Sequence, residues 1–275
     1  MEIRIREAKL EDKEKIIEFL REINPNDYIF NVLDFWLKDE SGKVLVAEHE
    51  GKIVAMNHFY QQNKESGWLE GARVHKDYRG RGIATMLALR SLELLKERGV
   101  KKARLVTSAT NIAAQRHLTR TPFKLHSKWL NINFQNTKFV NVEPYDNFSD
   151  VYDFLIKSKI FNELGRLCHD YFSWFDFNEE WLKNRIFKGE VYCDGENLVI
   201  ITSSTRRGDK YSVSYLECNS NNLIQMLNIA YSLANLKNKA SNILFVIPSL
   251  NEYKKILEKE KIEYYEQLVY EALIL

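Results

Sequence analysis

The sequence is poor in the residues that mark cross-linked or membrane-spanning chains. Its 275 residues include three cysteines, four prolines and 11 glycines. Cys168, Cys193 and Cys218 are odd in number and far apart, a pattern typical of neither a disulfide framework nor a zinc site. No apolar run reaches the length of about 18 residues that a membrane span needs, and the start of the chain is unlike a secretory signal. We therefore expect a soluble, cytoplasmic protein without a bound metal.

The sequence also lacks a strong excess of charge of either sign. The 40 Lys and Arg and 38 Asp and Glu leave a net charge of +2, which argues against an obligate nucleic-acid partner. Residues 1–138 are nevertheless net positive and residues 139–275 net negative. An anionic ligand would favour the basic half, although ordinary surface variation gives the same asymmetry. The apolar content of 45% is enough for a core in one large or two medium domains.

The most informative stretch is residues 78–84, Tyr-Arg-Gly-Arg-Gly-Ile-Ala, between a strand-like run (68–75) and a long helical pattern (83–98). A helix start carries unpaired N–H groups and the positive end of the helix dipole, and both favour an anion. Gly80 and Gly82 would let the backbone approach a phosphate closely. The stretch is not a P-loop, because Ile83 occupies the position of the P-loop lysine. It is not a dinucleotide-binding fingerprint either, because Thr85 occupies the position of the third glycine. The stretch predicts a pyrophosphate site.

Hydrophobic periodicity predicts a mixed order of strands and helices in the first half. Gly71 interrupts a strand and indicates a bulge, and Gly99 is placed to end the long helix. The predicted strands cover 3–6, 43–49, 52–61, 68–75, 104–107 and 123–134, and the predicted helices begin near 10, 30, 83 and 111. The order is β-α-α-β-β-β-α-β-α-β.

This order and the run from Arg79 to Ala84, which fits Arg-x-x-Gly-x-Gly/Ala, resemble the GCN5-related N-acetyltransferase (GNAT) superfamily. The resemblance implies acetyl-coenzyme A (acetyl-CoA) as the acyl donor. It also implies that Asn111 bonds the cofactor arm beside the small Ala114, although Asn111 could simply cap a helix. The implied cofactor contacts are backbone groups of Arg73 and Val74 for pantetheine, and of Arg79, Gly80, Arg81, Gly82, Ile83 and Ala84 for pyrophosphate.

Catalysis in that superfamily needs a base for the amine and a proton for the departing thiolate. Glu70, nine residues before Arg79, lies where several relatives place a base, and is otherwise an outward-facing strand carboxylate. The sequence departs from the family pattern at the proton donor, because Leu118 occupies the position where many relatives have a tyrosine. The neighbouring His117 lies about 100° away on the helix, and Tyr28 is a further candidate. The acid remains unassigned.

The second half resembles a degenerate second copy, with the order β-β-β-α-β-α-β. At the place of the glycine motif it has Glu217 to Asn221, without glycine or arginine. Aromatic residues between Tyr171 and Trp181 could form a pocket but are more typical of core. We expect an α/β (α+β mixed sheet) protein with two GNAT-like domains in tandem, residues 1–137 with the coenzyme site and residues 138–275 without it.

These observations predict an N-acetyltransferase acting on a primary amine of a small-molecule or peptide acceptor, with neither nucleic acid nor membrane as partner. One alternative is a non-catalytic acyl-CoA-binding sensor or scaffold, motivated by the missing tyrosine. Another is aminoacyl transfer from charged tRNA, which the intact phosphate motif and the modest charge disfavour. The acceptor and the oligomeric state cannot be deduced from the sequence.

Overall fold

A computed structural model describes residues 2–135, 138–204, 210–236 and 243–274. The chain divides into two compact units that interleave in sequence: unit 1 comprises Met1–Leu105, Asn111–Leu125 and Tyr270–Leu275, and unit 2 comprises Val106–Thr110 and His126–Val269. Thr137, the last residue of the first predicted domain, lies outside the described residues, so the boundary between 137 and 138 stays a prediction.

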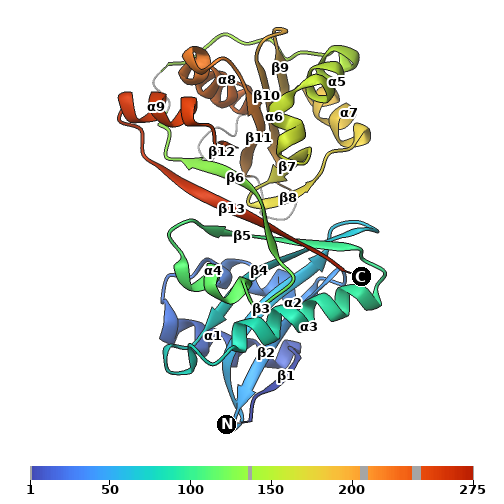
Figure 1. Cartoon of the computed structure of the whole chain (residues 1–275), viewed down its shortest axis with the longest axis vertical. Helices are drawn as coiled ribbons and strands as arrows, with labels where there is room; N and C mark the ends of the chain where they lie inside the picture. Colours follow the sequence, from blue (N-terminus) through green and yellow to red (C-terminus); the bar gives the residue numbers. More distant parts are fainter. Residues whose placement is uncertain (1, 136–137, 205–209, 237–242, 275) are drawn as a thin grey trace. The chain divides into compact units, whose positions relative to one another are not determined.

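Unit 1 is a sheet with helices on both faces (Figure 1). Its hydrogen-bonded strand order is β1-β2-β3-β4-β5-β13. Its elements are β1 (Arg4–Glu7), η1 (Leu10–Asp12), α1 (Lys13–Ile23), η2 (Tyr28–Asn31), α2 (Leu33–Lys38), β2 (Gly42–His49), β3 (Lys52–Gln61), β4 (Ser66–Val74), η3 (Lys76–Tyr78), α3 (Ile83–Glu97), the start of β5 (Lys102–Ser108), α4 (Ile112–Leu118) and the end of β13 (Tyr264–Leu273).

Two apolar cores lie on the two faces of the unit 1 sheet. On one face α1 and α2 pack through Phe19 and Trp36 against Val46 and Met56, all buried. On the other face α3 packs Leu87 and its neighbours against the opposite side of the same strands. The alternating strand residues that serve the two cores explain why β3 is buried along nearly its whole length.

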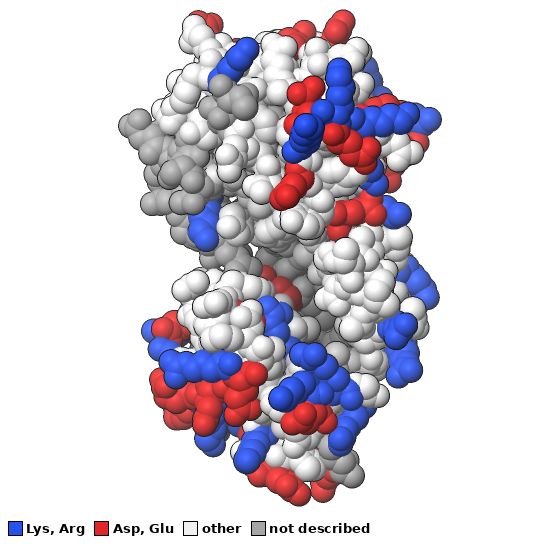
Figure 2. Space-filling model, turned by 90° about the vertical axis from the view of Figure 1, so that its left-hand side faces the viewer, with Lys and Arg blue, Asp and Glu red and all other residues white. Residues whose placement is uncertain are grey.

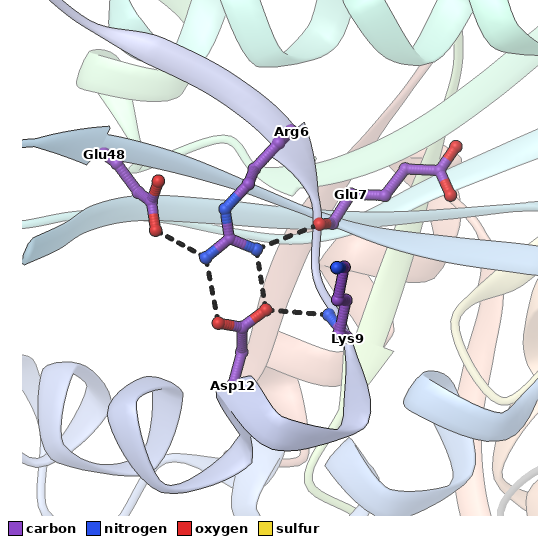
Figure 3. A network of polar contacts seen from close by, with 5 residues as sticks. All are labelled: Arg6, Glu7, Lys9, Asp12 and Glu48. Carbon is purple, nitrogen blue, oxygen red and sulfur yellow. Dashed lines mark hydrogen bonds and ion pairs between the residues drawn. The ribbon is translucent and has the colours of Figure 1, made fainter. Parts of the chain in front are cut away.

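A polar network ties the start of the chain to the sheet (Figure 3). The Arg6 guanidinium in β1 donates to both carboxylate oxygens of Asp12, at 2.6 and 2.8 Å, and to Glu48 in β2 at 2.5 Å. The Asp12 carboxylate also accepts from the Lys9 N–H at 2.8 Å. The hydrogen bond from Arg6 lowers the pKa of Asp12 to about 2, and this two-pronged ion pair fixes η1 and α1 against β1.

Unit 2 repeats the pattern of helices on a sheet, with the strand order β13-β6-β12-β11-β10-β9 and a separate hairpin of β7 and β8. Its elements are most of β6 (Lys124–Ile132), α5 (Phe148–Lys157), α6 (Lys159–Glu163), β7 (Leu167–Asp170), β8 (Ser173–Asp176), α7 (Glu179–Phe187), β9 (Val191–Cys193), β10 (Leu198–Ser203), β11 (Tyr211–Glu217), η4 (Ser220–Asn222), α8 (Leu223–Asn235), β12 (Ile243–Pro248), α9 (Asn251–Lys259) and most of β13.

The closing strand of each half contributes to the core of the other unit. In unit 2, β6 pairs antiparallel with β12, and its Leu130 and Ile132 join the core formed by α8. In unit 1, the end of β13 places Ala272 in the core beneath α3. There the buried Arg104 guanidinium of β5 binds Glu271 of β13, with 2.6 Å between Nη2 and Oε2. The sequence pattern predicts both strands but not this exchange.

Candidate functional site

The predicted phosphate motif forms an uncapped helix start in unit 1. Gly80 and Gly82 have φ values of 76° and 79°, and a Cβ built on either meets no atom within 4 Å. Gly82 is the N-cap of α3, so no side chain caps the helix. The first intrahelical bond runs from the Met86 N–H to the Gly82 C=O. The N–H groups of the first turn, Ile83 to Thr85, therefore face an open approach, as a phosphate requires.

The preceding strand, β4, loses its neighbour before it reaches the motif. Its parallel pairing with β5 covers three residue pairs and ends at Trp68 and Arg104. Antiparallel pairing with β3 continues to Val74, with a register shift at Gly71, whose φ is 68°. The predicted bulge is confirmed. From residue 69 to residue 74 one edge of β4 has no sheet partner within the described part of the chain, and we call this stretch the open edge.

The register decides which backbone groups face the open edge. The His75 N–H donates to the Val54 C=O at 2.9 Å, so the next pair along, Ala55 and Val74, is a non-hydrogen-bonded pair. The N–H and C=O of Val74 therefore point away from β3. Those of Arg73, opposite Met56, point toward β3. Because the peptide is planar, the Ala72 C=O points opposite to the Arg73 N–H, away from β3, and it accepts from Arg73 Nη1 at 3.0 Å.

Two arginine side chains of the predicted site make contacts within unit 1. Arg79 donates through Nε to the Val74 C=O at 3.2 Å, which joins the motif to the end of the open edge. Arg73 donates to both carboxylate oxygens of the buried Asp27, at 2.6 and 3.0 Å, and its guanidinium lies 5.5 Å from the Tyr28 ring centroid. Arg73 thereby holds the turn between α1 and α2 against β4.

Glu70 is largely buried, with 11% of its side chain exposed, and is not the outward-facing carboxylate of the alternative interpretation. Its Oε1 lies 3.1 Å from Nδ1 of His58, the residue directly opposite on β3. The His58 ring stacks on Trp36 of α2 at 4.4 Å between ring centroids. Trp36 also fills the space beside Gly71, where a Cβ would come within 2.6 Å of its ring.

Helix α4 lies beside the start of α3. Asn111 caps α4, since its side chain accepts from the Ala114 N–H at 3.1 Å. Leu118 is buried in the core beneath α3. His117 is partly buried; desolvation lowers its pKa, and its Nδ1 has no hydrogen-bond partner among the described residues. Burial therefore favours the neutral form of the His117 imidazole, which is a weaker proton donor than the imidazolium.

Unit 2 contains a counterpart of the open edge at the end of β11, and there a side chain of unit 2 bonds to the strand backbone. Strand β11 pairs in parallel with β12 over three residue pairs, Tyr211 to Val213 with Ile243 to Phe245. At the end of β11 the Tyr253 hydroxyl of α9 accepts from the Cys218 N–H at 2.8 Å and donates to the Cys218 C=O at 3.0 Å. Both Tyr253 and Cys218 are buried. A phenol thus bonds to both backbone groups of Cys218, whereas at Val74 in unit 1 the Arg79 side chain bonds to the C=O.

The surface, the helix lengths and the metal-binding side chains add three observations. On the face in Figure 2, basic and acidic side chains of unit 1 gather in separate patches rather than in one basic surface. None of the described helices is long and apolar enough to cross a bilayer. In the same described ranges, no three or more His, Cys, Asp or Glu side chains gather to hold a metal ion.

Comparison with known proteins assigns the fold. The model of the acetyltransferase (GNAT) family matches residues 8–120. No curated protein matches the sequence. A GCN5-related N-acetyltransferase from Sphaerobacter thermophilus superposes with a TM-score of 0.62 at 10% identity, over 99% of this chain and 96% of that chain. A candidate acetyltransferase from Thermoplasma acidophilum gives 0.59 at 15% identity, over 98% and 99%. A third, from Pyrococcus horikoshii, gives 0.54 at 16%, over 98% and 89%. These likenesses confirm the predicted tandem GNAT fold.

Proposed function

We propose that this chain transfers the acetyl group of acetyl-CoA to a primary amine of a small-molecule or peptide acceptor, on the premise that its residues 8–120 match the model of the acetyltransferase (GNAT) family. The observation that carries the proposal is the uncapped start of α3, where Gly82 leaves the first-turn N–H groups open toward an anion. The family match supports the reaction class, and the uncapped helix start supports a pyrophosphate site there.

In this proposal the donor lies along the open edge. The backbone N–H groups of residues 79–84 hold the pyrophosphate, and Val74 offers its N–H to the pantetheine arm. Ala72 replaces Arg73 as the second pantetheine contact, because the backbone groups of Arg73 face β3. Asn111 keeps its capping role, which aims the start of α4 toward the cofactor arm.

Glu70 acts as the base. The amine nitrogen attacks the thioester carbonyl carbon, the C–N bond forms, the C–S bond breaks, and the amine proton passes to the Glu70 carboxylate directly or through a water. The thiolate leaves without a dedicated acid, because Leu118 is buried in the core. Most of the acceleration comes from alignment of amine and thioester, on the order of several kcal/mol.

Unit 2 serves in this proposal as a structural partner that does not take the donor. The Tyr253 hydroxyl already bonds to both backbone groups of Cys218, and α8 begins after Asn222 without a glycine loop. Glu217 would also repel a pyrophosphate.

The buried Leu118 also favours a second candidate, an acyl-CoA-binding protein without turnover. The two are separated by measuring free thiol release from acetyl-CoA with a panel of amines comprising a polyamine, free amino acids and peptides with free N-termini. Amine-dependent thiol release is the expected result. Calorimetric binding of acetyl-CoA without turnover would establish the second candidate, and absence of binding would overturn both.

A further inference from the structure

His58 is a buried polar residue that the proposed reaction leaves unexplained. It lies in the middle of β3 between Asn57 and Phe59, and none of its surface is exposed. Burying an imidazole costs free energy unless its polar atoms are engaged. Its Nδ1 lies 3.1 Å from the Glu70 carboxylate, so the imidazole makes a polar contact with the proposed base.

The surroundings of His58 fix the direction of its ring. Trp36 lies parallel to the ring, with an interplanar angle of 7° and 4.4 Å between centroids. At the opposite end of the imidazole, a Cβ on Gly42 would come within 2.7 Å of Nε2, so only glycine at this position leaves room for the ring. The stack and the close backbone together prevent the imidazole from turning away from Glu70.

The strand register fixes the carboxylate side of the contact. His58 and Glu70 are direct cross-strand partners in β3 and β4, and the register shift at Gly71 comes immediately afterwards. Direct partners on one sheet face have Cβ atoms about 5 Å apart, which suits a hydrogen bond between their side chains. Glu70 therefore precedes the bulge and remains paired with His58 of β3.

We propose that His58 is the positioning residue for Glu70: its Nδ1–H donates to Oε1 and fixes the carboxylate in the direction from which it takes the amine proton. The inference rests on the proposed function, because it gives His58 no role without a base at Glu70. A buried carboxylate with a fixed donor keeps one orientation through the reaction, whereas a free one would spread over several rotamers. His58 itself exchanges no proton with the substrate.

Two substitutions separate the hydrogen bond from the packing of the ring. In His58→Asn the side-chain amide can place a donor where Nδ1 stands, and in His58→Leu a methyl group takes that place. Both leave a similar space beside Trp36, so both should lower the melting temperature by a similar amount. His58→Leu should lower kcat by about 10- to 100-fold with the KM for acetyl-CoA unchanged, while His58→Asn should recover most of the loss.

Steady-state thiol release and melting temperature are measured for these two variants, for Glu70→Gln and for the double variant E70Q/H58L. The inference requires the double variant to be no slower than Glu70→Gln alone, because a positioning residue has nothing to position once the base is gone. If H58L has the kcat of the wild type, if H58N is as slow as H58L, or if the two effects multiply, His58 is a packing residue only. Should H58L fail to fold, His58→Gln, which has no donor at the Nδ1 position, takes its place.

The same data separate the inference from the function on which it rests. A wild-type kcat in Glu70→Gln removes the base and the positioning role together, while acetyl transfer stands. No thiol release by the wild-type protein with any amine of the panel refutes the proposed function, and the inference with it. Slow turnover in Glu70→Gln beside undiminished turnover in H58L refutes the inference alone.

Discussion

Gly82→Asp tests the donor site most directly, because Gly82 is both the N-cap of α3 and a residue with φ of 79°. A side chain at this φ costs about 1–2 kcal/mol of folding free energy. A Cβ there meets no neighbouring atom, so the new carboxylate has room to reach the N–H groups of Ala84 and Thr85. Aspartate is a favourable N-cap residue, and its capping bond offsets part of the strain. The variant should therefore fold.

The same capping bond should lower the affinity of the Gly82→Asp variant for coenzyme A. Each N–H group that the carboxylate occupies removes a hydrogen bond to the charged pyrophosphate, and such a bond contributes about 1.5–3 kcal/mol. Repulsion between two negative charges about 4 Å apart adds up to about 4 kcal/mol at the effective dielectric constant of a protein surface. Solvent screening and side-chain rotation reduce the sum, so we expect a loss of about 3–4 kcal/mol, or 10²- to 10³-fold in the Kd for coenzyme A.

Gly99 provides a matched control at the other end of α3. Its φ is 78°, and a Cβ built on it likewise meets no atom within 4 Å. Gly99→Ala and Gly82→Ala should lose similar stability, and Gly99→Ala should bind coenzyme A as the wild type does. Isothermal titration calorimetry with melting curves gives both quantities. A folded Gly82→Asp variant with the affinity of the wild type would refute the assignment of the donor site.

Two further predictions concern stability. Arg6 lowers the pKa of Asp12 to about 2, so the contribution of this ion pair to stability is fully present above the ordinary carboxyl pKa of 3.8. The free energy of unfolding should fall by about 2 kcal/mol as the pH drops from 5 to 2. Urea unfolding should show this fall, and Arg6→Met should abolish it. Tyr253→Phe should lower the free energy of unfolding by about 1–3 kcal/mol, because the Cys218 N–H and C=O lose their partner, and denaturation with unchanged stability would contradict the closure of unit 2.

Local signals in the sequence predict the regular elements of the fold well. The hairpin of β2 and β3 turns at Glu50 and Gly51, both at positive φ, where the sequence predicts a turn, and Gly99 ends α3 as expected. The hairpin of β7 and β8 is missed, because it turns through Tyr171 and Phe172. These residues take positive φ without a glycine to mark the turn, so the aromatic run carries no turn signal. Trp174 within that run is fully buried, which confirms its place in the core.

The exchange of closing strands lies beyond local signals for a different reason. β6 and β13 have the alternation that any half-buried strand shows, and alternation specifies a face but not a neighbour. Which edge each strand joins depends on contacts such as Arg104 with Glu271, 167 residues apart in sequence. No pattern within a window of the sequence could have paired those two residues.

The candidate site shows the same limit at the scale of single residues. The glycine motif can be predicted because its residues are adjacent in sequence. Val74 can be predicted because the family pattern fixes its separation in sequence from Arg79. The choice between Arg73 and Ala72 depends on the hydrogen-bonding phase of β4 against β3, which only the pairing of His75 with Val54 reveals. His58 resembles a core histidine in the sequence, and its contact with Glu70 follows from the strand register alone.

We propose that the two units differ in donor binding through one comparable position. Among the described residues of each unit the parallel pairing covers three residue pairs and ends before the strand does. Tyr253, the third residue of α9, meets the end of β11, and its hydroxyl bonds to Cys218. The third residue of α4 is Ala114, whose side chain has no group that could make such a bond. The topology therefore creates a place for an amide-bearing ligand in both units. A small side chain keeps it open in unit 1, and a tyrosine fills it in unit 2, where a buried backbone N–H and C=O would otherwise lack partners.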